Sequence, residues 1–242
     1  MGATELWLVR HGESTANVAA DHAEHEGFET IEVAERDADV PLSQLGVQQA
    51  RAFGRWLGEA EHAPDAAWVS PYLRARQTAG TALEVAGEQP PVRIDERLRD
   101  RELGILDLLT SRGVEARYPD EAARRRRLGK YYYRPPGGES WADVALRLRS
   151  VLHDIDRSND GQTVLVVAHD AVVMLIVSIC LELDEQQLLD FTLVNTVSNA
   201  SVTTLRRGAQ GWELVAFSDD EHLLAKSVPV TEHSGDKDAE IH

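Results

Sequence analysis

Cysteine, positive charge and long apolar runs are all scarce in this 242-residue chain. The single cysteine, Cys180, excludes a disulfide framework and a cluster of thiolate metal ligands. Lys and Arg number 25 against 41 Asp and Glu, and the net charge of −16 argues against general binding to nucleic acid or anionic membranes. The longest apolar run, residues 171–181, is shorter than the roughly 20 residues that a membrane span needs.

The composition that is present is typical of a globular protein. Hydrophobic residues make up 43% and charged residues 27%, and a chain of this length fits one domain or a domain with an inserted cap. No basic leader precedes an apolar segment at the start, so we expect no signal peptide and a cytoplasmic location. Cys180 lies within the apolar run and is expected to be a core residue.

Apolar strands and amphipathic helices alternate along the chain. We predict strands at 5–9, 66–70, 92–95 and 162–170, helices at 41–60, 72–87, 139–156 and 171–183, and a terminal hairpin over 200–218. The continuous apolar strand 162–170 is typical of a strand buried on both faces of a parallel sheet. The alternation predicts a doubly wound, three-layer α/β/α fold with a mostly parallel sheet.

Two segments depart from this rhythm. Residues 105–138 are rich in Arg, Tyr, Pro and Gly with weak periodicity, and we interpret them as a cap insertion. Residues 219–242 are polar and acidic without periodicity, which predicts a disordered tail. Residues 1–218 then form a single domain.

Each of the two most apolar strands ends in a histidine, His11 and His169. Ligands of doubly wound sheets bind at the carboxyl ends of the strands, so the two side chains can meet in space. Arg10 and Arg74 would repel a metal cation there, but their forked donors suit a phosphoryl group. A neutral His11 can attack phosphorus, and a buried carboxyl group can protonate the departing alcohol.

Several motifs then carry a family resemblance. They are LVRHGEST with Asn17, PLSQLGVQQA, SPYLRARQTA, LRDRELG, PGGESW and VVAHD, in this order over residues 5–205. The sequence resembles the histidine phosphatase superfamily, whose members include cofactor-dependent phosphoglycerate mutases and many phosphatases. The resemblance implies a phosphohistidine intermediate, no cofactor and no metal.

The same resemblance implies roles for individual residues. His11 would be the nucleophile, and Arg10, Arg74 and His169 would form the phosphate pocket. The resemblance further implies substrate contacts at Gly12 and Asn17, with Glu13 as a supporting partner beside the phosphate.

The general acid is an open choice at this stage. The family's usual glutamate aligns with Asp100, and Glu102 lies two residues further on, on the same side of an extended segment. Asp170 stands where many members have glycine, and its field could depress or orient His169.

Other polar residues have simpler explanations. Ser43 is expected to cap a helix, and Glu139 with Ser140 either caps the next helix or contacts substrate. Residues 21–26 hold His22 and His25 among acids, and we interpret them as a solvated loop rather than a metal site. The run Arg124–Arg127 either lies in the cap with one or two cationic side chains near the pocket mouth, which would favour substrates with a second anionic group, or consists of solvated or ion-paired surface arginines.

We expect the protein to hydrolyse phosphomonoesters, with small phosphorylated metabolites as its substrates. We expect it to bind neither nucleic acid nor membranes. Cofactor-dependent phosphoglycerate mutase is the first alternative. The resemblance favours the phosphatase, because the segment before PGGESW is shorter than the corresponding insertion of those mutases and would let water reach the phosphohistidine. A non-catalytic phosphoryl-binding protein of the same fold is the second. A homodimer is left open.

Overall fold

The central β1 (Glu5–Arg10) belongs to a six-stranded sheet in the computed structural model, which describes residues 2–233. The strand order is β3-β2-β4-β1-β5-β6. The other strands are β2 (Ala66–Val69), β3 (Val92–Ile94), β4 (Thr163–Ala168), β5 (Val202–Gly208) and β6 (Gly211–Asp219). The first four strands in chain order pair in parallel and the last two are antiparallel, which confirms the mostly parallel sheet.

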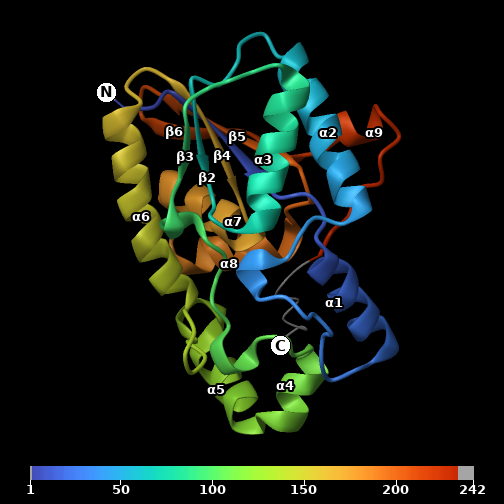
Figure 1. Cartoon of the computed structure of the whole chain (residues 1–242). Coiled ribbons are helices and arrows are strands. Elements are labelled where there is room, and N and C mark those ends of the chain that lie inside the picture. Colours follow the sequence, from blue (N-terminus) through green and yellow to red (C-terminus); the bar gives the residue numbers. More distant parts are fainter. Residues whose placement is uncertain (1, 234–242) are drawn as a thin grey trace.

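Helices cover both faces of the sheet, which gives the predicted three layers (Figure 1). Trp7 and Val9 of β1 pack toward α2 (Gln44–Glu59) and α3 (Leu73–Ala86). Leu6 and Leu8 point to the other face, toward α6 (Trp141–Ser158), α7 (Asp170–Cys180) and α8 (Glu185–Val194). The alternation follows from the two-residue period of a strand, and burial on both faces requires all these residues to be apolar.

Helix starts follow the predicted caps. Ser43 Oγ accepts a hydrogen bond from Gly46 N at 2.9 Å at the start of α2, and Ser140 Oγ accepts one from Asp143 N at 3.1 Å at the start of α6. Both serines are therefore N-caps, and each satisfies an amide that the first helical turn leaves unpaired.

The segment between β3 and α6 consists of short helices. They are η2 (Glu96–Leu98), η3 (Gly104–Leu106), α4 (Ser111–Arg117) and α5 (Pro119–Tyr132). Figure 1 shows α4 and α5 below the sheet, on the same side as α1. Arg126 of α5 donates to Glu115 of α4 at 3.1 Å, and both side chains are exposed.

Residues 21–26 do not form the solvated loop that their polarity predicted. They belong to α1 (Thr15–Glu26), which Gly27 ends in the left-handed conformation with φ of 69°. The helix is nucleated by a capping box, in which Ser14 and Asn17 each bond the other's backbone amide. Polar composition alone does not reveal that nucleus, and this is why the prediction was wrong.

The part of the acidic tail that the structure describes is also ordered, contrary to prediction. It contains the short helix α9 (Glu221–Leu224), where Leu223 is fully buried and His222 lies against Phe53 and Trp56 of α2. These few apolar contacts anchor a segment whose average composition is polar. The remainder of the predicted tail, 234–242, lies outside the described residues.

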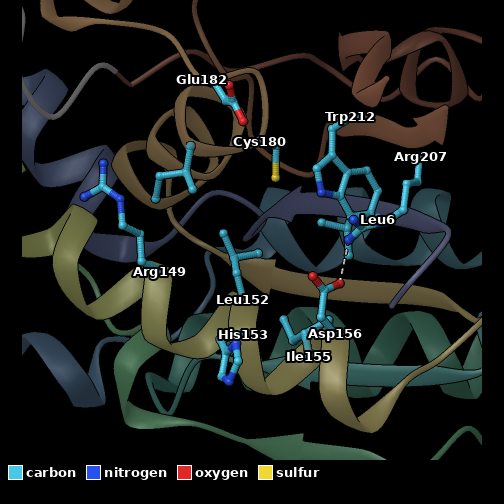
Figure 2. A pocket seen from close by; sticks show the side chains of 12 residues that line it. Leu6, Arg149, Leu152, His153, Ile155, Asp156, Cys180, Glu182, Arg207 and Trp212 are labelled. Carbon is cyan, nitrogen blue, oxygen red and sulfur yellow. Dashed lines mark hydrogen bonds and ion pairs between the residues drawn. The ribbon is translucent and has the colours of Figure 1, made fainter. Parts of the chain in front are cut away.

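A surface pocket of about 340 Å³ lies between α6, α7 and β6 (Figure 2). Cys180, Trp212 and the ion pair between Arg207 and Asp156 line it. Burial raises the pKa of Cys180 to about 12, so its thiol stays protonated and unreactive. Within residues 2–233, no helix combines the length and apolar character needed to cross a bilayer.

Candidate active site

Strand register brings the two strand-end histidines together. β1 and β4 are parallel neighbours whose last paired residues are Arg10 and Ala168, so His11 and His169 leave the sheet side by side. His11 N donates to Ala168 O at 3.0 Å, and the two imidazole rings lie 5.2 Å apart, edge to face. The structure thus places the predicted histidines in one cluster, at the carboxyl edge of the sheet.

Arg74 reaches this cluster from the first turn of α3. Its Nε donates to His11 Nε2 at 3.2 Å, and its Nη2 donates to Asp100 Oδ2 at 3.0 Å. Its Nη1 donates to the backbone carbonyl and the carboxylate of Asp37, at 2.7 and 2.8 Å. Asp37 lies in η1 (Asp37–Asp39), so a loop far from α3 in sequence fixes the guanidinium.

The hydrogen bonds of His11 define its tautomer. Its Nδ1 lies 2.7 Å from Gly12 O, a group that can only accept, so Nδ1 carries the proton. Nε2 is then the lone-pair nitrogen that accepts from Arg74. Burial, with the added charges of Arg74, His169 and Arg10, lowers the pKa of His11 well below its usual value. The ring is therefore neutral at physiological pH, as a nucleophile must be.

Ser70 orients His169 from the end of β2. Ser70 N donates to Val167 O at 2.9 Å, which places its hydroxyl 2.8 Å from His169 Nε2. His169 Nδ1 is then turned toward Asp100 Oδ2, at 3.2 Å. Burial lowers the pKa of His169, while Asp100 opposes that shift.

Asp100 lies between two cationic or polar partners, His169 and Arg74. Burial raises the pKa of its carboxyl group, but the charge of His169, its hydrogen bonding and the charge of Arg74 lower that pKa well below its usual range. Without a bound anion Asp100 is therefore ionised. Its position, within 3.2 Å of both partners, places it inside the cluster.

Glu102 lies further out than Asp100. Its side chain is 51% exposed against 24% for Asp100, and it accepts a hydrogen bond from Tyr72 Oη at 3.1 Å. Tyr72 packs between Arg74, 4.9 Å from its ring centroid, and His169, 5.2 Å away. Glu102 therefore lies at the border of the cluster and contacts it through Tyr72.

Gly12 is where two backbone segments meet. A Cβ atom on Gly12 would lie 2.6 Å from Gly46 O, so the turn after β1 can approach α2 only with glycine at this position. Gly12 N donates to Thr78 Oγ1 at 3.0 Å, and its carbonyl holds His11. Gly12 thus acts on the site through its backbone.

Glu13 and Asn17 are held by other protein groups. Glu13 Oε1 accepts from Ser43 Oγ at 2.5 Å, and its Oε2 lies 3.4 Å from His233 Nε2. Asn17 Oδ1 accepts from Ser14 N and Oγ, both at 3.0 Å, in the capping box of α1. Both residues stabilise the segment that follows His11.

Arg10 is fixed by backbone carbonyls and keeps one donor unused. Its Nη1 donates to Val197 O and its Nη2 to His233 O, both at 2.6 Å. Its Nε is buried without a hydrogen-bond partner, which is costly unless an anion satisfies it. Burial lowers the pKa of Arg10, and the negative charge of Asp170 is the largest influence that opposes this shift.

Sequence reasoning missed three contributors: Ser70, Asp37 and His233. Ser70 had a usable signal, because it ends a strand beside β4 just as His11 does. Asp37 and His233 lie in irregular segments with no periodicity or motif that would place them near Arg74 and Arg10. Among residues 2–233, no group of three or more His, Cys, Asp or Glu side chains is arranged to hold a metal ion.

The sequence and the fold are similar to those of several known proteins. The phosphoglycerate mutase of Methylobacterium radiotolerans that depends on 2,3-bisphosphoglycerate is 34% identical over 191 residues, 78% of this chain and 84% of that protein. The native structure of a mycobacterial glucosyl-3-phosphoglycerate phosphatase has a TM-score of 0.69 at 27% identity, covering 90% of this chain and 99% of that one. A putative alpha-ribazole-5'-P phosphatase from Escherichia coli shares the fold, with a TM-score of 0.74 at 21% identity over 90% and 97%.

A model of one family covers nearly all the elements described above. The family is the histidine phosphatase superfamily (branch 1), and its model matches residues 6–220, from β1 to the start of the C-terminal segment. The chain therefore belongs to the histidine phosphatase superfamily.

Proposed function

We propose that this protein hydrolyses small phosphorylated metabolites in the cytoplasm through a phosphohistidine on His11. The observation that carries the proposal is the neutral, buried His11 whose Nε2 lone pair faces Arg74. The unpaired Nε of Arg10 supports it, because a phosphoryl oxygen would satisfy that donor. Such preorganised donors stabilise charge that develops on the phosphoryl oxygens during transfer.

The first half-reaction transfers the phosphoryl group to His11. Arg74 Nε exchanges His11 Nε2 for a phosphoryl oxygen, which frees the lone pair to form the nitrogen–phosphorus bond. As the substrate dianion binds, Asp100 takes up a proton from solvent. The bond between phosphorus and the alcohol oxygen then breaks, and Asp100 gives this proton to that oxygen. A bound phosphate dianion adds negative charge beside Asp100 and raises its pKa, which opposes the lowering by His169 and Arg74.

The second half-reaction releases phosphate. Asp100, now ionised, takes a proton from the attacking water as the oxygen–phosphorus bond forms and the nitrogen–phosphorus bond breaks. His11 returns to the neutral tautomer that Gly12 O stabilises. Burial of Asp100 against His169 and Arg74 favours it over the more exposed Glu102 for both proton transfers.

Phosphoglycerate mutase activity is a second candidate, favoured by the 34% identity to the Methylobacterium radiotolerans enzyme. Both reactions share the phosphohistidine and differ in the acceptor of the phosphoryl group. Water is the acceptor in the phosphatase, and a phosphoglycerate is the acceptor in the mutase.

A panel of phosphomonoesters, assayed with EDTA present, tests the proposal. We expect phosphate release that survives EDTA and disappears in His11→Ala. Isomerisation of 3-phosphoglycerate on addition of 2,3-bisphosphoglycerate, without ester hydrolysis, would favour the mutase. Phosphate binding without turnover of any substrate would identify a non-catalytic binding protein.

A further inference from the structure

A second surface pocket, of about 370 Å³, lies along the chain segment that follows Glu102. Most of its wall is apolar, and we define the apolar pocket by these side chains: Ile31, Ile105, Leu108, Leu109 and Tyr118. Three of them, Ile105, Leu108 and Tyr118, are exposed to solvent. Exposed apolar side chains that gather in one hollow indicate a ligand with an apolar part, because such a ligand would remove their surface from water.

Leu108 contributes to the apolar pocket from a strained backbone conformation. Its φ is 56°, in the left-handed region, where a Cβ atom crowds the following carbonyl oxygen. Two hydrogen bonds hold it there, from Leu108 N to Asp107 Oδ1 at 3.0 Å and from Ile31 N to Leu108 O at 2.9 Å. Strained residues of this kind persist where neighbouring groups fix them, and they are common at ligand sites.

One fixed segment joins the apolar pocket to the catalytic cluster. Ile105 follows Glu102 by three residues, so their Cα atoms are at most about 11 Å apart. Glu102 O accepts a hydrogen bond from Glu139 N at 2.9 Å, and Ile105 N donates to Pro136 O at 3.0 Å. Both ends of the segment are therefore tied to residues 136–139, and the pocket wall keeps its place relative to Asp100, which precedes Glu102.

The charged side chains of the wall agree with this position and with an uncharged ligand. Burial and the charge of Asp37, which binds Arg74, raise the pKa of Asp107 in the wall. Arg117, the cationic side chain of the wall, pairs with Glu29 at 3.0 Å. The wall therefore suits a hydrocarbon group better than a second phosphate or a carboxylate.

We propose that the apolar pocket binds the hydrocarbon part of the leaving alcohol, and that Leu108 makes the enzyme prefer phosphomonoesters of apolar alcohols. The proposal rests on the proposed phosphatase function and specifies its substrate class. Transfer of one methylene group from water into apolar surroundings corresponds to about fourfold in kcat/KM. Two methylene groups that enter the pocket should therefore raise kcat/KM by about tenfold or more.

Ethyl, butyl and hexyl phosphate test the proposal, because their alcohols leave with nearly the same acidity and differ only in hydrocarbon length. We expect wild-type kcat/KM for phosphate release to rise along the series, by about tenfold from ethyl to hexyl phosphate. In Leu108→Asn and Leu108→Gly the ratio of hexyl to ethyl phosphate should fall about threefold or more. Asn and Gly both accept the left-handed conformation, so these variants remove the side chain and keep the backbone.

The ratio isolates the pocket, because partial loss of folded protein lowers kcat/KM for all three esters by the same factor. Leu146→Asn is the matched control: it removes an exposed leucine from α6, outside the apolar pocket, and should leave the ratio unchanged. A wild-type kcat/KM that does not rise with chain length, or a wild-type ratio in both Leu108 variants, would overturn the pocket proposal while the phosphatase stands. Absence of His11-dependent hydrolysis of every ester would instead reject the proposed function, and the pocket proposal with it.

Discussion

Ser70→Ala removes a hydroxyl that contacts His169. The change in kcat/KM of this variant measures how much catalysis depends on the orientation of the His169 ring. Ser70 is fully buried, and its Oγ lies 2.8 Å from His169 Nε2 and 3.3 Å from Tyr72 N. A buried polar atom left without a partner costs about 1–3 kcal/mol. The free energy of unfolding should fall by about that amount. We expect the loss of His169 orientation to raise the activation barrier by roughly 1.4 kcal/mol, which lowers kcat/KM by about tenfold.

The assay is steady-state hydrolysis of a phosphomonoester, alongside urea unfolding of each variant. Ser70→Thr keeps a hydroxyl and should restore most of the activity, whereas Ser178→Ala, another buried serine in α7, should leave kcat/KM unchanged. Wild-type kcat/KM in Ser70→Ala would refute the argument, because His169 would then keep its orientation without this contact. A stability loss with full activity would assign Ser70 to folding alone.

Three further predictions concern the same cluster. Asp100→Asn should lower kcat for alkyl phosphates by about 10²–10⁴-fold, with a smaller loss for aryl phosphates, whereas Glu102→Gln should change kcat for alkyl phosphates less than about threefold. A larger loss in Glu102→Gln than in Asp100→Asn would make Glu102 the general acid. Burial lowers the pKa of His11 in the folded state, so the unfolded chain binds one more proton as the pH falls below about 6.5, and the free energy of unfolding declines there. His11→Asn should reduce this decline between pH 7.5 and 5.5 by about 1 kcal/mol, measured by urea unfolding at each pH. The same decline in the variant and the wild type would contradict this. Ending the chain after Val228 removes the His233 carbonyl that accepts a hydrogen bond from Arg10, and it should weaken inhibition by inorganic phosphate several-fold. Unchanged inhibition would show that Arg10 keeps its position without this hydrogen bond.

The regular part of the fold could be predicted from local sequence patterns. The apolar runs of β1 and β4 and the serine caps of α2 and α6 are signals within a few residues of each other. The meeting of His11 and His169 could also be predicted, because strands in parallel sheets end at one edge. These inferences needed no knowledge of long-range contacts.

The remaining contacts depend on segments with no periodicity. Asp37 binds Arg74 across 37 residues, and His233 binds Arg10 across 223. The acidic composition after residue 218 predicts disorder, whereas the buried side chain of Leu223 anchors the part of this segment that the structure describes. Such contacts are set by tertiary packing, and composition averages hide them.

The central claim is a covalent phosphoryl group on His11. The most direct measurement is rapid acid-free quenching of the protein with a 32P-labelled phosphomonoester, followed by peptide mapping. The account predicts an acid-labile, base-stable label on the peptide that contains His11, and neither label nor turnover in His11→Asn. Turnover in His11→Asn, or a wild-type enzyme that hydrolyses substrate without labelling any histidine under single-turnover conditions, would contradict it.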